Sequence, residues 1–270
     1  MLASDSEARP LSGIGQADMV FEMPVTPNGI TRMMAVYQCG QPREVGSIRS
    51  ARMEFLPLAQ GLDAIYAHWG GEHEALALLS GGLLDNVDAL RYEGTVYYRK
   101  PKIARPHNGF TTIEALREKA DELAYASSSS FTPYRHTDQS PERNLASLAT
   151  EVTVAWPQGF GVKFTYDAET NRYLRERGGT PEIDALDGAQ VSASVVVVMR
   201  TEASPDYGQY IHVRTTGEGV ATIYQGGRRT EARWKKPAAK DMLVFVDGRD
   251  QQIPLTPGTI WVLVEAPLPQ

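Results

Sequence analysis

The sequence Glu44-Val-Gly-Ser-Ile-Arg-Ser-Ala-Arg-Met-Glu-Phe-Leu56 passes from a short apolar strand, through an Arg-Ser-x-Arg turn, into a helical pattern. Ser50 stands where its hydroxyl can cap that helix. Free N–H groups at a helix start favour anions, and Arg49 and Arg52 add two guanidiniums at the same place. The segment therefore predicts an α/β unit with a phosphate or carboxylate site at a strand-to-helix junction.

The first half of the chain continues this alternation of strand and helix. Apolar and β-branched runs predict strands over residues 17–22, 29–37, 44–49, 63–69 and 92–99. Helical periodicity predicts helices over residues 53–60, 72–79 and 113–124, with Thr112 capping the last. These patterns predict an α/β N-terminal domain, a mixed sheet with helices, over residues 1–140.

Short extended segments separated by glycine and acidic turns fill the second half. Strands are predicted over residues 152–156, 161–166, 171–176, 192–200, 210–215, 220–224, 242–246 and 260–264. A spacing of roughly ten residues predicts a mainly β C-terminal domain over residues 141–270, barrel-like or a curled antiparallel sheet. The serine-rich stretch 127–141 predicts a linker or long surface loop between the two domains.

Composition excludes several classes of function. The 270 residues carry a net charge of −6, so no specific nucleic-acid partner is expected. No apolar run reaches the ~18 residues of a membrane span, so no transmembrane helix is expected. The single cysteine, Cys39, excludes an internal disulfide. No Walker loop, dinucleotide fingerprint or HExxH motif is present, and we expect no cofactor and no metal site.

Polar, mostly cationic side chains follow three predicted strands of the first half. They are Arg49, Ser50 and Arg52 after the first strand, His68 after the second, and His107 with Asn108 after the third. Ligands of α/β sheets bind outside the carboxyl ends of the strands, so we expect these residues to face one crevice if the strands are parallel neighbours. Arg32, inside the strand 29–37, is a further candidate.

Each candidate also has a plain structural interpretation. Asp18, Glu22 and Glu54 are available as salt-bridge partners for the arginines. In the second half, the basic stretch 226–236 could bind a polyanion, with Trp234 stacking on a base or sugar. Alternatively it forms a charged hairpin whose tryptophan fills the β core, and the acidic composition of the whole chain favours this hairpin.

A series of motifs runs in order along nearly the whole chain. Among them are Val45-Gly-Ser-Ile-Arg-Ser-Ala-Arg52, Pro106-His-Asn108 and Pro257-Gly-Thr-Ile-Trp261, with further matching segments at 9–22, 29–32, 63–68, 164–167, 173–175, 195–198, 217–219 and 234–235. Together they resemble the YerB-like putative lipoprotein family. The resemblance implies an α/β region followed by a β-rich region, in an extracytoplasmic protein that is lipid-anchored at the bacterial surface or secreted. It also implies that the protein contacts the membrane only through a lipid anchor absent from this chain. The family has no settled activity.

Two details qualify this resemblance. Pro181-Glu-Ile-Asp184 stands where the family pattern has His-x-Asp, so of that pair this chain keeps Asp184. The chain also resembles, more loosely, the LytR-CpsA-Psr phosphotransferases, through Asp18-Met-Val and Ser47-Ile-Arg-Ser50. These are exported α/β enzymes that bind a polyprenyl pyrophosphate with arginines. Such an analogy raises a hypothesis about function and does not establish one.

Two functions are consistent with these residues. The first is a cell-envelope protein whose Arg/His-lined cleft binds an anionic small molecule or envelope glycan. Its expected ligand contacts are Arg32, Arg49, Ser50, Arg52, His68, His107 and Asn108. The alternative is an envelope phosphotransferase or phosphohydrolase acting on a phosphate ester or diphosphate, with His68, His107 or Asp18 as catalytic candidates. Because no nucleophile or metal set completes a mechanism, the sequence favours binding.

Overall fold

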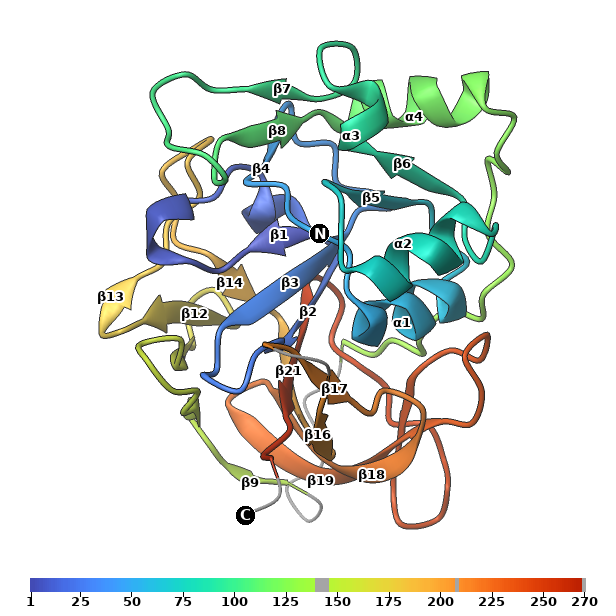
Figure 1. Cartoon of the computed structure of the whole chain (residues 1–270). Helices are drawn as coiled ribbons and strands as arrows, with labels where there is room; N and C mark the ends of the chain where they lie inside the picture. The colour runs from blue at the N-terminus through green and yellow to red at the C-terminus, as the bar shows by residue number, and fades with distance from the viewer. Residues whose placement is uncertain (139–145, 207–208, 269–270) are drawn as a thin grey trace.

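One open, mixed sheet forms the centre of the computed structural model, which describes residues 1–138, 146–206 and 209–268 (Figure 1). Its strands in spatial order are β1 (Leu2–Ala3), β3 (Thr31–Val36), β2 (Met19–Pro24), β21 (Ile260–Glu265), β15 (Val195–Arg200), β18 (Gly217–Gln225), β19 (Arg228–Lys236) and β20 (Val244–Val246), with β9 (Ser147–Leu148) paired to β19. Strand β21 pairs in parallel with both β2 and β15. The sheet therefore combines strands from both halves of the chain, and it does not close into a barrel.

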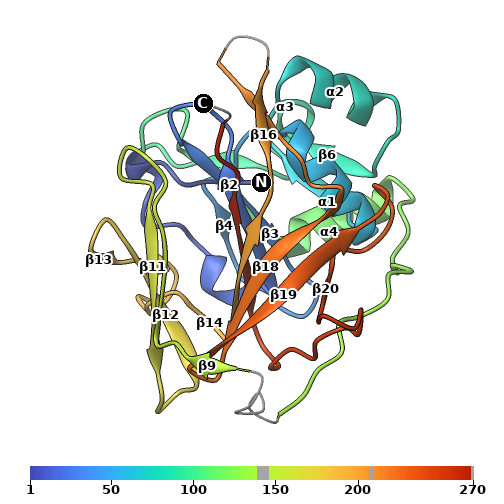
Figure 2. The same ribbon diagram turned by 90° about the horizontal axis from the view of Figure 1, so that it is seen from below.

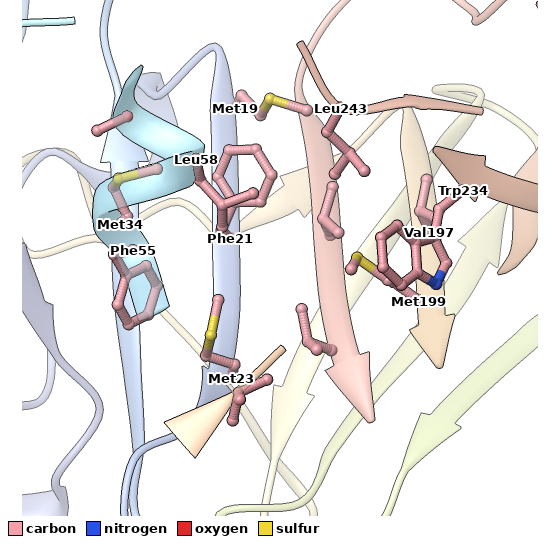
Figure 3. Close-up of a cluster of buried hydrophobic side chains, with 14 of the residues drawn as sticks. Met19, Phe21, Met23, Met34, Phe55, Leu58, Val197, Met199, Trp234 and Leu243 are labelled. Atoms are coloured by element: carbon pink, nitrogen blue, oxygen red, sulfur yellow. The ribbon is translucent and has the colours of Figure 1, made fainter. Parts of the chain in front are cut away.

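Strands at the middle of this sheet bury side chains on both faces. In β2, Met19, Phe21 and Met23 point into one core while Val20 points into the other, as expected for a side-chain period of two. Trp234 of β19 belongs to the same core as Phe21 (Figure 3). Burial on both faces explains why these strands appear in the sequence as nearly continuous apolar runs.

A second sheet covers one face of the main sheet. Its strands are β10 (Glu151–Val154), β11 (Val162–Asp167), β12 (Arg172–Arg177), β13 (Thr180–Pro181) and β14 (Ser192–Ala193). Helices α1 (Leu56–Gly61) and α2 (His73–Ser80) lie on the opposite side (Figure 2). The centre of the molecule is therefore a three-layer arrangement with two hydrophobic cores.

Small sheets and short helices, most of them from the first half, surround this centre. The small sheets are β4 (Val45–Gly46), β8 (Gly109–Thr111) and β7 (Tyr98–Arg99); β5 (Tyr66–His68) with β6 (Asn86–Asp88); and, from the second half, β16 (Ala203–Pro205) with β17 (Ile211–Val213). The remaining helices are η1 (Ser6–Ala8), η2 (Ile14–Gln16), η3 (Met53–Phe55), α3 (Ala89–Tyr92) and α4 (Ile113–Glu122). No helix of the described residues is both long and apolar enough to cross a bilayer.

The predicted fold class, α/β followed by a mainly β region, is confirmed. Thr112 caps α4 as expected, because its hydroxyl accepts the N–H of Ala115 at 3.0 Å. The predicted strand 92–99 is wrong over most of its length, since α3 ends at Tyr92 and a turn precedes β7. The Ser50 cap is also wrong, because the helical segment starts at Met53 without a side-chain cap.

The sequence predicted one shared crevice on the condition that the strands of the first half are parallel neighbours. The observed strand pairing does not meet this condition. Strand β4 pairs antiparallel with β8, which also pairs antiparallel with β7, whereas β5 pairs in parallel with β6 in a separate sheet. The three strand-to-helix junctions are therefore not equivalent ends of one parallel sheet. The predicted division at residue 140 stays a prediction, and part of its linker, residues 139–145, lies outside the described residues.

A buried ion network joins the second sheet to the main sheet. Glu22 of β2 accepts hydrogen bonds from Arg175 and Arg177 of β12, each at 2.6 Å, and Glu182 accepts one from Arg175 at 2.7 Å. All four side chains are almost fully buried. Such a network specifies how the sheets pack, because a charge that lost its partner here would be stranded away from water.

Two sequence features of the second half have structural roles. Asp184 accepts the N–H groups of Gly13 and Gly15 at 2.9 and 2.7 Å, so it fixes the loop that precedes β2. Trp234 is fully buried and donates its indole N–H to the Arg200 carbonyl at 2.8 Å. The basic stretch 226–236 is thus the charged hairpin whose tryptophan fills the core.

Candidate functional site

Three arginines from two segments of the chain meet beside strand β1. Arg32 lies in β3, which pairs with β1. Arg49 and Arg52 follow β4, and a bridge between Leu2 and Ile48 holds that segment against β1. The three guanidiniums lie close enough that each of the other two lowers the pKa of Arg32. The name arginine cluster is used below for Arg32, Arg49, Arg52, Asp5 and His107.

Arg32 is the most deeply buried member of the cluster, with 5% of its surface exposed. Its guanidinium pairs with Asp5 at 3.1 Å and donates to the Thr31 carbonyl at 2.8 Å. Burial lowers the pKa of Arg32 to about 10, and Asp5 opposes that shift. Since the guanidinium remains charged at neutral pH, this site holds a cation at a cost in desolvation.

Arg49 and His107 form the more accessible part of the cluster. Arg49 donates to the Pro106 carbonyl at 3.3 Å, which holds it beside the loop that carries His107. Burial lowers the pKa of both side chains, and Arg49 lowers that of His107 further. His107 is therefore mainly neutral at pH 7, and one ring nitrogen can donate to an anion.

Four buried nitrogens of the arginine cluster have no hydrogen-bond partner among the described residues. They are Nε of Arg32, Nε of Arg49, Nε of Arg52 and Nδ1 of His107. Buried polar groups are normally paired, and an unpaired one costs roughly 1–3 kcal/mol. A ligand with several acceptor oxygens would satisfy such donors, and a phosphate or carboxylate matches guanidinium geometry best.

Arg52 joins the cluster to a group of acidic and aromatic side chains. Its guanidinium lies 4.6 Å from the ring centre of Tyr210, and its Nε lies 3.9 Å from Glu72. Tyr210 comes from the loop between β16 and β17, so the second half of the chain contributes directly to this region. The contact at 3.9 Å is too long for a hydrogen bond, which leaves Arg52 only loosely neutralised.

Glu54 is the most perturbed acid of this region. It lies in η3, is 2% exposed, and its Oε2 has no hydrogen-bond partner among the described residues. Burial raises the pKa of Glu54 to about 8, with a further increase from Glu72. A carboxyl group that keeps its proton near neutral pH is typical of functional sites.

Two predicted site residues have structural contacts elsewhere. The ring nitrogens of His68 contact the Gly70 carbonyl at 2.8 Å and the Asn86 side chain at 3.2 Å, so both are occupied within the β5–β6 sheet. Asp18 accepts three backbone N–H groups of residues 38–40. It precedes β2, whereas Arg32 pairs with Met23 near the far end of β2, roughly 15 Å away at the usual rise per residue.

Asn108 and Ser50 flank the cluster. Asn108 accepts a hydrogen bond from Arg99 at 2.8 Å, and this bond shapes the turn that carries His107. Ser50 is half-buried in the turn between Arg49 and Arg52. A pocket of about 470 Å³ lies elsewhere, between residues 41–43 and the start of α4. The predicted cleft around the arginines stays a prediction.

Four residues that the structure adds to this region carry little signal in the sequence. They are Asp5, Glu54, Glu72 and Tyr210. The sequence indicates Glu54 only as a salt-bridge partner for the arginines, although its place inside an apolar helical segment is a signal of burial. Nothing local marks Tyr210, because it reaches Arg52 through the folding of a distant hairpin.

Comparisons with known proteins agree along nearly the whole chain. Residues 1–126 match the N-terminal domain, and residues 152–262 the C-terminal domain, of the family described as "Protein of unknown function (DUF3048)". The chain is 26% identical over 261 residues to "Putative lipoprotein YerB" of Bacillus subtilis (strain 168), covering 95% of this chain and 77% of that protein.

The fold is also similar to a solved structure. The crystal structure of YerB protein from Bacillus subtilis superposes with a TM-score of 0.88 at 25% sequence identity, covering 98% of this chain and 89% of that one. The expected family resemblance is thereby confirmed.

Proposed function

The chain belongs to the DUF3048 family of proteins of unknown function, and from this premise we propose that it is an extracytoplasmic protein whose arginine cluster binds a phosphate- or carboxylate-bearing ligand. Its ligand would contact Arg49 and His107 first, because they are the more exposed members. Arg32 and Arg52, which are more deeply buried, would add positive charge. The ligand is an anionic small molecule or the anionic end of an envelope glycan.

One observation carries the proposal. The Nε atoms of Arg32, Arg49 and Arg52 are buried without a hydrogen-bond partner among the described residues, although the three guanidiniums lie within electrostatic range of one another. Like charges brought together at a desolvation cost require an opposing charge. Asp5 supplies one carboxylate to Arg32, and an anionic ligand would compensate the remaining guanidiniums.

The proposed location follows from the relative in Bacillus subtilis, whose name describes a lipoprotein. A lipoprotein is exported and held at the membrane by its lipid, so a protein of the same fold is expected to work in the cell envelope. Fractionation of cells that express the full-length protein, with detection in membrane and cytoplasmic fractions, tests this location. Recovery in the cytoplasm alone would contradict it.

Binding is tested by calorimetric titration of inorganic pyrophosphate into wild type and Arg49→Ala. A charge-assisted hydrogen bond contributes roughly 1.5–3 kcal/mol, so the substitution should weaken binding by about 10- to 150-fold. Arg49→Lys should recover only part of the loss, because lysine has no planar two-pronged donor. Arg249→Ala removes an exposed arginine of a distant turn and serves as the control for net charge.

The proposal fails if wild type binds neither pyrophosphate nor an organic phosphate at millimolar concentration. It also fails if Arg49→Ala remains folded and binds as tightly as wild type. Rising salt should weaken wild-type binding more than binding by Arg49→Ala, since one charge of the site is then missing.

An envelope phosphotransferase or phosphohydrolase is the second candidate. The observation in its favour is Glu54, whose pKa is raised by burial to about 8, near the buried guanidinium of Arg52. Such a group can carry a proton to or from a leaving oxygen at neutral pH. Release of phosphate from pyrophosphate or a phosphate ester, lost in Glu54→Gln, would support the enzyme; tight binding without turnover supports the binding protein.

A further inference from the structure

Two carboxyl groups, those of Glu54 and Glu72, lie within electrostatic range of Arg52. Glu54 belongs to η3, and Glu72 is the N-cap residue of α2. One oxygen of Glu72 accepts the N–H of Met53 at 2.6 Å, while the other lies 3.9 Å from Arg52. Oε2 of Glu54 is buried without a hydrogen-bond partner among the described residues.

These carboxyl groups are insufficiently neutralised by the protein. Burial raises the pKa of each, and Glu72 adds to the shift of Glu54. Arg52 opposes both shifts, but its cationic group is shared with the Tyr210 ring at 4.6 Å. A second positive group beside these carboxyl groups would therefore be held favourably, because it would favour the ionised form of both.

The charges of the region differ from one part to the other. Arg49 and Arg52 lie close enough to Arg32 to lower its pKa, so three guanidiniums gather at the arginine cluster. Beside Arg52, Glu72 and Asp206 each add to the raised pKa of Glu54, so three acidic groups gather there. A simple anion would match the arginines and be repelled by the acidic groups.

We propose that Glu54 and Glu72 form a subsite for a primary ammonium group, and that the ligand of the arginine cluster is a small zwitterion that carries this ammonium beside its anionic group. The inference rests on the proposed anion binding and names its ligand class. An ammonium has three N–H donors, which match the free Glu54 oxygen and the second Glu72 oxygen. No group of three His, Cys, Asp or Glu side chains among the described residues is arranged to hold a metal ion there.

The experiment compares two ligands that differ by one amine. Phosphoethanolamine and ethyl phosphate are titrated by calorimetry into the full chain, with sn-glycerol 3-phosphate as a hydroxyl-bearing third ligand. We expect phosphoethanolamine to bind at least about tenfold more tightly than ethyl phosphate, as one charge-assisted hydrogen bond implies. In Glu54→Gln and in Glu72→Gln the two affinities should converge. Glutamine at position 72 keeps an acceptor for the Met53 N–H.

The outcomes separate the two proposals. If none of the three phosphates binds, anion binding and the ammonium subsite both fail. If ethyl phosphate binds as tightly as phosphoethanolamine, or if glycerol 3-phosphate binds more tightly than both, only the ammonium subsite fails. A preference for phosphoethanolamine that survives in both folded glutamine variants also overturns it.

Discussion

Glu54→Gln should make the protein more stable at neutral pH and should change how its stability depends on pH. In the folded chain, burial raises the pKa of the Glu54 carboxyl from 4.5 to about 8. Between those values the folded state holds a proton that the unfolded state releases. By linkage, the free energy of unfolding therefore falls as pH rises through this window, and glutamine removes that loss.

The magnitude follows from the same two pKa values. Integrating the proton difference from about pH 5 to about pH 7 gives a loss of roughly 2–3 kcal/mol in wild type that the glutamine variant does not suffer. Glu72, Asp206, Arg52 and Tyr66 all face Glu54. Because these groups are present in both proteins, the difference between the two proteins isolates Glu54.

Urea denaturation at a series of pH values, followed by tryptophan fluorescence, measures this difference. Glu169→Gln, which removes an exposed carboxyl group, is the matched control and should show no comparable dependence. If the stability difference between Glu54→Gln and wild type is the same at both ends of the range, Glu54 ionises as in water, and the interpretation of its burial is wrong.

Two further predictions concern the fold. Arg175→Ala should destabilise the protein by roughly 3–5 kcal/mol in urea denaturation, because it leaves the two buried carboxylates, Glu22 and Glu182, with Arg177 as their remaining cationic partner. Arg200→Ala, which breaks a more exposed ion pair, should cost about 1 kcal/mol or less, and equal losses would contradict the role given to burial. Gly46→Ala should lower the thermal midpoint, since an added Cβ would lie 2.2 Å from the Phe110 ring. Gly248→Ala, with open space around it, should not, and a midpoint unchanged in both variants would show that the β4–β8 contact is not tight.

Local sequence patterns were sufficient for the fold class and for most elements. Helix α4 follows from its periodicity and the Thr112 cap, and the central strands follow from their apolar runs, because these signals depend on neighbouring residues. The prediction of a strand from Tyr92 was wrong because aromatic residues there suit a strand locally, whereas the packing of α3 determines the observed turn. The resemblance to the YerB-like family was also contained in the sequence.

Only part of the arginine cluster could be predicted from residues that are neighbours in the sequence. Arg49 and Arg52 are close because only two residues, Ser50 and Ala51, lie between them, which the sequence shows directly. Arg32 joins them through the pairing of β1 with β3 and the bridge from Leu2 to Ile48, and these contacts depend on long-range strand order. Tyr210 reaches Arg52 from the second half of the chain, through a hairpin that no local pattern relates to the first half. The sequence by itself determines the spacing of side chains along the chain. Which side chains are buried, and which distant charges lie near them, depends on how strands pair and layers pack. Only the tertiary structure therefore shows that Glu54 is buried among charged groups and that the ring nitrogens of His68 already have partners.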